Sequence, residues 1–475
     1  METNQTPTSL NVFERFNQWI EESISVKLFS IGFLVIILLI PSSWIVDLME
    51  EREGRASSVM EEVADKWSHS QRLSGPVLVI PYKVIDKLTQ NNKEVVLKER
   101  IEKYFFLPEK LEVNGVLDPK ILQRGIFDAV VYNASLTINA AFNKPDFKTL
   151  GIADEMILWQ QAHMIFSISD LRGISENPVF KVGALPKETE PSSDLGMIIE
   201  TIDHKTPAYG ETVAVENTSH TAKGIIAKLN WQSAQDFQGN TLVNLNLKGS
   251  KSLRFLPTGK TTLVSLNSNW TSPGFDGQFI PENRNIDEKG FTANWKVLNY
   301  NRAFAQQWTG KNQSIDGSDF GVNLLLPVDQ YQKSMRTAKY GQLIIILTFM
   351  ALFLVEITKR IKIHPFQYIL IGAALIIYYS LLLSLSEQLG YDLAYIVASL
   401  ATVILISFYS ASFLNSTRLV VLLTALLVVF YTFIFVIILQ QDFSLLLGSI
   451  GLFFIVAALM FFSRKISWYK SSAIH

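Results

Sequence analysis

Long apolar runs and one long stretch of mixed polarity divide the chain. The apolar runs cover residues 28–46, 341–357, 365–385, 391–414, 419–439 and 444–462. Each is close to the ~20 residues that a helix needs to cross the hydrocarbon core of a bilayer. The pattern therefore predicts an α-helical bundle of six transmembrane helices. The first is expected to be an uncleaved anchor, since no small-residue cleavage site follows it.

The insert between the first two runs, residues 47–340, begins with a helical pattern. Val59, Val63 and Trp67 recur at four-residue spacing, while acidic and basic residues fill the other face. We therefore expect residues 47–72 to continue the first helix beyond the membrane.

The rest of the insert has a period of two. Phe291, Ala293 and Trp295 alternate with polar residues, and the same alternation occurs in 225–231 and 243–248. Such strands in series predict a large β-rich domain, antiparallel and sandwich-like. The stretch PKETEPSSD at 186–194 is interpreted as a junction between two lobes.

The composition excludes several classes of protein and several kinds of site. The 475 residues have a formal net charge of −1 and include no cysteine. The apolar runs exclude a purely soluble protein, and the near-zero charge gives no support for a nucleic-acid partner. The lack of cysteine excludes disulfides, thiolate metal sites and cysteine nucleophiles.

Lysine and arginine are unevenly distributed over the short connections and the tail. The segments after the second, fourth and sixth apolar runs contain Lys359, Arg360, Lys362, Arg418, Arg464, Lys465 and Lys470. The connections 386–390 and 440–443 contain no lysine or arginine. Since short basic segments stay in the cytoplasm, we predict that residues 1–27 and 463–475 are cytoplasmic. The insert 47–340 is then periplasmic.

Motifs for catalysis or cofactor binding are incomplete. GKTT at 259–262 resembles the end of a phosphate-binding loop, but Arg254 stands where the motif needs glycine, which favours a strand–turn–strand connection. DGSD at 316–319 lacks the spacing of a calcium loop, and the histidines lack the spacing of metal ligands. We expect no cofactor, no metal ion and no enzymatic activity. A triad assembled from distant residues is an alternative that spacing does not test.

Ionisable residues near the ends of the runs are the candidate functional residues. Glu356 lies at the cytoplasmic end of the second run, where an ion pair with Arg360, four residues on, explains it without transport. His364 and Gln367 begin the third run nearby, with Tyr368, and are candidate hydrogen-bond partners of Glu356.

Acidic and basic residues both occur near the predicted periplasmic ends of the apolar runs. Glu387, Asp392 and Asp442 flank the helix ends, and Lys333, Arg336 and Lys339 precede the second run. They are interpreted either as a coupling between the insert and the bundle or as separately solvated side chains.

The sequence resembles the CreD family of bacterial inner-membrane proteins, described as cell envelope integrity proteins. The resemblance rests on Trp67 with Gln71, GPVLVIPY at 75–82, Leu256-Pro257 with Gly259, Trp270 with Pro273, Phe275, Gly277, Phe279 and Pro281, Gly290-Phe291 with Ala293 and Trp295, Lys339-Tyr340-Gly341, Thr348-Phe349, Glu356, His364-Pro365 with Gln367-Tyr368, 384–387 and 445–448. Gln441 stands before Asp442 where the family pattern leads us to expect a second carboxylate. This departure weakens an ion site there.

The resemblance implies an inner-membrane location and a role in envelope integrity or the envelope stress response, without a known reaction. We therefore expect a non-catalytic protein whose periplasmic domain binds or senses an envelope component. Its expected partners are the lipid bilayer and an envelope component or membrane protein. The alternatives are a transporter or channel, for which Tyr378 and Tyr379 offer a lining, and an envelope-modifying hydrolase.

Overall fold

The structure is a computed structural model that describes residues 24–90, 93–203, 216–310, 314–315, 317–324, 330–359, 361–414, 416–440 and 443–464. They form two compact units. The helical unit lies within Met1–Arg55 and Val328–His475, and the β domain covers Ala56–Pro327. The predicted β-rich insertion between the first and second helices is confirmed.

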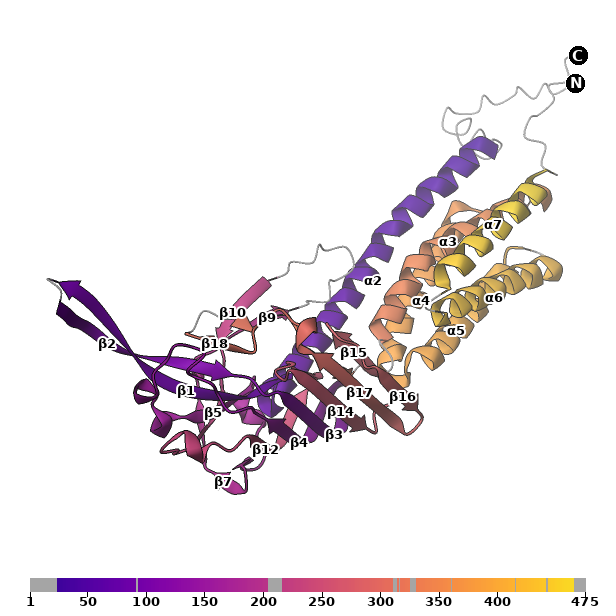
Figure 1. Ribbon diagram of the computed structural model, residues 1–475. Coiled ribbons are helices and arrows are strands. Elements are labelled where there is room, and N and C mark those ends of the chain that lie inside the picture. Colours follow the sequence, from indigo (N-terminus) through magenta and orange to yellow (C-terminus); the bar gives the residue numbers. More distant parts are fainter. Residues whose placement is uncertain are drawn as a thin grey trace, which may run out of the picture. The chain divides into compact units, whose positions relative to one another are not determined.

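Six helices lie in the part of the chain that the structure describes (Figure 1). They are α2 (Ile24–Trp67), α3 (Gln330–Lys359), α4 (Pro365–Leu389), α5 (Tyr391–Ala411), α6 (Thr417–Leu439) and α7 (Ser444–Ser463). The first five are long and apolar enough to cross a membrane, and α7 has a shorter described apolar stretch, Leu446–Ala457. Six membrane spans stay a prediction, because the described residues contain five helices of sufficient length and apolar composition.

Two helices extend beyond their apolar runs. α2 continues without a break from the first run to Trp67. α3 begins at Gln330 rather than at 341, because the polar residues before the apolar run continue the same helix.

The helical unit has its own apolar core. Buried side chains come from α2 to α6, among them Leu38 of α2, Phe349 of α3 and Leu427 of α6. Gly372 of α4 lies so close to α2 that a Cβ atom there would stand 2.3 Å from Leu38. Glycine at this position lets the two helices pack closely.

The β domain contains two large sheets. The 8-stranded sheet has the order β16-β17-β14-β3-β4-β12-β6-β7. Figure 1 shows β16, β17, β14, β3, β4 and β12 side by side. Its strands are β3 (Lys110–Arg124), β4 (Phe127–Ala141), β6 (Val179–Val182), β7 (Leu185–Lys187), β12 (Asn240–Ser250), β14 (Thr261–Ser268), β16 (Asn283–Asp287) and β17 (Gly290–Leu298).

The 9-stranded sheet follows the order β15-β20-β13-β1-β5-β11-β8, with β2 pairing β1 and β18. Its strands are β1 (Gln71–Gln90), β2 (Lys93–Phe106), β5 (His163–Ile168), β8 (Thr189–Ser192), β11 (Gly224–Lys228), β13 (Ser252–Phe255), β15 (Pro273–Gly277), β18 (Gln307–Thr309) and β20 (Phe320–Leu324). A further small sheet holds β9 (Ile198–Asp203), β10 (Glu216–Thr221) and β19 (Ser314–Ile315).

One core connects the two large sheets. It contains Phe166 and Phe320 of the 9-stranded sheet together with Leu245 and Trp295 of the 8-stranded sheet. In β17 the apolar residues are buried and the polar residues exposed, as the alternation predicts. The sandwich-like arrangement follows from this shared core.

Not every strand pair is antiparallel. β1 pairs with β13, and β3 with β14, in parallel. These partners are far apart in sequence, so a long crossover can join them in parallel, whereas the sequence alternation carries no information on strand direction.

Two stretches singled out in the sequence have simple structural roles. Residues 186–194 form most of β7 and all of β8, which belong to different large sheets, so this stretch joins the two sheets within one compact unit. Residues 259–262 lie between β13 and β14 and enter β14, which is the strand–turn–strand connection that the missing glycine favours.

Candidate functional site

Glu356 is a buried carboxylate in the helical unit. Its side chain is 3% exposed and forms an ion pair with Lys27 of α2. It also accepts hydrogen bonds from the Tyr368 hydroxyl at 3.0 Å and from the backbone N–H of Ile363 at 3.1 Å. Three segments of the chain therefore meet at one carboxylate.

The short connection between α3 and α4 places these groups. The Nδ1 atom of His364 accepts from the N–H of Phe366, and the Gln367 side chain accepts from the N–H of His364, so the two side chains cap α4. Capping fixes the first turn of α4 and directs Tyr368 toward Glu356. Of the three proposed hydrogen-bond partners, Tyr368 makes the contact. Arg360, the proposed ion-pair partner, lies outside the described residues.

The contacts of Glu356 with Lys27, Ile363 and Tyr368 hold α2, α3 and α4 together, and we call them the first clamp. A buried carboxylate that loses its only cation destabilises a protein by about 3–5 kcal/mol. Because Lys27 and Glu356 are far apart in sequence, no local pattern reveals the pair. The sequence showed Glu356 but gave no sign of its cation.

A second set of charges lies at the other end of the same helices. Glu387 of α4 accepts a hydrogen bond from the Tyr331 hydroxyl at 3.2 Å and lies 3.9 Å from the Arg52 guanidinium of α2. Lys333 of α3 lies 3.7 Å from the Asp392 carboxylate of α5. Opposite charges thus meet between helices of the helical unit.

The other predicted outer residues are placed differently. Arg336 and Lys339 are exposed on α3. Asp442 lies outside the described residues. Neither Arg52 nor Tyr331 was singled out from the sequence, although both contact Glu387.

We call the contact of Glu387 with Arg52 the second clamp. Its distance along α2 from the first clamp is close to the thickness of a bilayer. Lys27 and Arg52 are 25 residues apart (52 − 27), which corresponds to about 38 Å in a straight helix. A bilayer has a hydrocarbon core of about 30 Å and measures about 40–45 Å with its headgroup regions. The ion pairs tie α2 to α3 and α4, and the predicted membrane span of α2 would place them at heights where headgroups and water are available.

Between the clamps lies a cluster of buried tyrosines. Tyr378 contacts Tyr379 and Tyr431 edge to face, and the Tyr395 hydroxyl donates to the Tyr431 carbonyl at 2.7 Å. Gly341 admits the ring of Tyr379, since a Cβ atom there would stand 2.3 Å from it. The tyrosines considered as a transport lining are thus packed in the core.

In the β domain, a polar junction fixes the end of α2. Gln71 is 1% exposed, and its amide donates to the carbonyls of Asp170 and Lys248 at 2.9 and 3.0 Å. Its carbonyl accepts from the Asp170 N–H and the Ser169 hydroxyl. Lys248 also lies 4.7 Å from the ring of Trp67, the last residue of α2.

The carboxylate of Asp170 completes the junction. It accepts from the Ser68 hydroxyl, the His69 N–H and the Arg172 guanidinium. Burial alone would raise the pKa of Asp170, but the hydrogen bonds from Arg172 and His69 outweigh it and hold this pKa well below its usual range. Asp170 is therefore an anion at neutral pH and orders the turn between α2 and β1.

The outer face of the 8-stranded sheet carries two rows of uncharged side chains, all of them polar except Val116. Strand pairing aligns Asn283, Asn294, Ser265, Asn114, Thr137 and Asn244 in the first row. The second row is Asn285, Thr292, Asn267, Val116, Ser135 and Asn246. We call these twelve residues the amide rows.

The part of the amide rows that lies on β3, β4, β12 and β14 lines a shallow hollow. Its volume is about 540 Å³, and its lining comes from β3, β4, β12 and β14. Neighbouring strands are about 4.8 Å apart, so amides and hydroxyls repeat at that interval across the sheet. The sequence showed that β12 has an outward polar face, but the rows depend on strand register, which it does not encode locally.

Among the described residues, no group of three or more histidine, aspartate or glutamate side chains is placed to hold a metal ion. The polar arrangements that organise the described chain include the ion-pair clamps, the Gln71–Asp170 junction and the amide rows.

Comparison with known proteins gives the family. The sequence profile described as "Inner membrane protein CreD" matches residues 23–469. The chain belongs to the CreD family. It is 30% identical over 448 residues to "Inner membrane protein CreD" of Escherichia coli (strain K12), with 94% of each chain covered. The match confirms the resemblance seen in the sequence and identifies an inner-membrane protein.

Residues that carried the CreD resemblance occur in the clamps and the junction. Glu356 and Tyr368 form the first clamp, and Glu387 belongs to the second. Gln71 and Trp67 form the junction at the end of α2. All twelve residues of the amide rows lie outside those motifs.

Proposed function

We propose that this CreD-family protein is a non-catalytic inner-membrane protein that supports envelope integrity by binding the glycan strands of peptidoglycan through the amide rows. In this proposal six helices span the membrane, both termini are cytoplasmic and residues 47–340 are periplasmic. The distribution of lysine and arginine over the short connections supports the orientation.

The observation that carries the proposal is the regular register of the amide rows. Eleven of the twelve positions are asparagine, serine or threonine, and Val116 is the exception. Amides and hydroxyls both donate and accept hydrogen bonds, as do the hydroxyl and acetamido groups of sugars. A glycan strand lying across the β-strands can meet one position of a row at each strand, and every position except Val116 is polar.

The chemistry of the rows favours binding over catalysis. Their side chains are neutral, whereas general acid–base catalysis uses groups that titrate near neutral pH. The Asn246 amide already donates to Glu176 at 2.7 Å, so part of the second row is fixed in orientation. Pre-ordered donors and acceptors lose less entropy on binding.

Removing two central groups of the first row tests the proposal. The double variant Thr137→Val/Asn244→Leu keeps side-chain size but removes hydrogen bonds worth about 0.5–1.5 kcal/mol each. We expect the full chain in detergent to sediment with purified peptidoglycan sacculi, and the variant to bind about tenfold more weakly or worse.

The matched control is Gln307→Leu/Thr309→Val, two exposed positions on β18 of the other sheet. We expect it to bind sacculi as the wild type does. Equal binding by both double variants, or no binding by the wild type, contradicts the polysaccharide proposal.

A further inference from the structure

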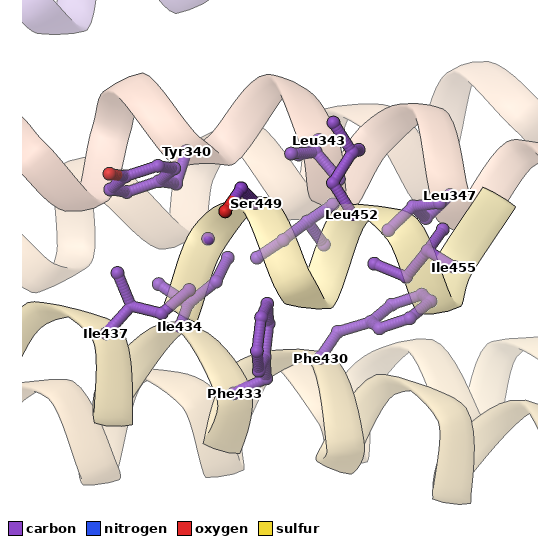
Figure 2. A pocket seen from close by; sticks show the side chains of 12 residues that line it. Tyr340, Leu343, Leu347, Phe430, Phe433, Ile434, Ile437, Ser449, Leu452 and Ile455 are labelled. Carbon is purple, nitrogen blue, oxygen red and sulfur yellow. The ribbon is translucent and has the colours of Figure 1, made fainter. Parts of the chain in front are cut away.

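A cavity lies among α3, α6 and α7 in the helical unit (Figure 2). Its volume is about 320 Å³. Leu343 and Leu347 of α3, Phe430 and Phe433 of α6, and Leu452 and Ile455 of α7 point toward it. Its lining is almost wholly apolar, with the Tyr340 hydroxyl and Ser449 as the polar groups.

Two glycines of α7 explain why the cavity exists. A Cβ atom at Gly451 would stand 1.9 Å from the Phe433 ring, so α7 touches α6 there. A Cβ atom at Gly448, which lines the cavity, would meet nothing within 4 Å. α7 therefore packs closely at one turn and leaves room at the previous one.

Helix spacing places Arg336 next to the Tyr340 end of the cavity. Arg336 precedes Tyr340 by one turn of α3, and this spacing puts it on the face that carries Tyr340, Leu343 and Leu347. Arg336 is exposed and has no ion-pair partner among the described residues. It lies before the apolar run, at a height where arginine reaches the headgroup region of a bilayer.

We propose that this cavity binds one acyl chain of an anionic phospholipid, with the lipid phosphate at Arg336 and the Tyr340 hydroxyl. The proposal needs only that α3, α6 and α7 lie in a bilayer, and it does not depend on the amide rows. An apolar gap among membrane helices is surrounded by lipid chains, which fill such gaps because water is absent.

Charge decides which lipid is bound. Lipid tails are as apolar as leucine, so the tail itself gains packing contacts but little hydrophobic free energy. The cation at the end of the cavity supplies the preference, since each arginine near the surface favours an anionic headgroup about fivefold. Phosphatidylglycerol should therefore be retained in preference to phosphatidylethanolamine.

The test is native mass spectrometry of the purified full chain in detergent with added phosphatidylglycerol, phosphatidylethanolamine or undecaprenyl phosphate. We expect the wild type to retain phosphatidylglycerol in preference to the other two lipids. Gly448→Leu fills the open space and should reduce retention to background. Arg336→Gln should still retain lipid, but its ratio of bound phosphatidylglycerol to bound phosphatidylethanolamine should fall about fivefold.

The control is Gly32→Leu, at an exposed glycine of α2 that also has no atom within 4 Å of its Cβ position. It should retain the lipid, and all variants should keep the wild-type melting temperature or exceed it. The proposal is overturned if Gly448→Leu retains as much lipid as Gly32→Leu, if Arg336→Gln keeps the full preference, or if undecaprenyl phosphate is retained instead.

Discussion

The variant Lys27→Met is expected to lose about 3–5 kcal/mol of unfolding free energy, because it removes the cation that pairs with the buried Glu356 carboxylate among the described residues. The hydrogen bonds from Tyr368 and Ile363 remain, but neither supplies a charge. Chemical denaturation of the full chain in a mild detergent measures the loss, with helix content as the signal.

Two further variants separate the ion pair from general damage at this membrane face. Lys359→Met removes an exposed lysine near the end of α3 and should change stability by less than about 0.5 kcal/mol. Lys27→Met/Glu356→Gln leaves no buried charge and should recover most of the lost stability. A double variant as unstable as Lys27→Met shows that the pair is not a clamp.

The second large effect is expected at the junction that fixes the end of α2. Gln71→Leu removes both the donor and the acceptor of a buried amide that contacts Asp170 and Lys248. Buried polar groups that lose a partner cost about 1–3 kcal/mol each, so we expect a loss of about 3 kcal/mol from the β domain.

Hydrogen–deuterium exchange of the full chain gives the sharpest readout of this change. The Asp170 N–H, which donates to Gln71, should exchange much faster in Gln71→Leu. Gln123→Leu, at an exposed position of β3, is the control and should leave that exchange unchanged. Unchanged protection of Asp170 in Gln71→Leu excludes the proposed role of Gln71.

The sequence predicted the parts of the fold that depend on local pattern. The apolar runs coincide closely with α4, α6 and α7, since hydrocarbon excludes polar residues over a fixed length. The alternation in β17 predicted which side chains are buried, because neighbouring residues of a strand point to opposite faces.

Contacts between segments far apart in the chain could not be predicted from the sequence. Helices that are apolar all round give no indication of which face meets a neighbour, so Lys27 was not recognised as the partner of Glu356. Likewise, asparagines recur on separate strands, but only the register of β3, β4, β12 and β14 aligns them in rows. The sequence identified single candidate residues, and the packing of helices and the register of strands identified their partners.

The orientation of the chain is the central claim, and labelling of single cysteines tests it most directly. The native chain has no cysteine, so Asn294→Cys, Gln388→Cys and Ser416→Cys each give one thiol for a reagent that does not cross the inner membrane. In intact spheroplasts we predict labelling at 294 and 388, and labelling at 416 only after lysis. Labelling at 416 in intact spheroplasts, with 294 and 388 protected, contradicts the periplasmic β domain and every role proposed for it.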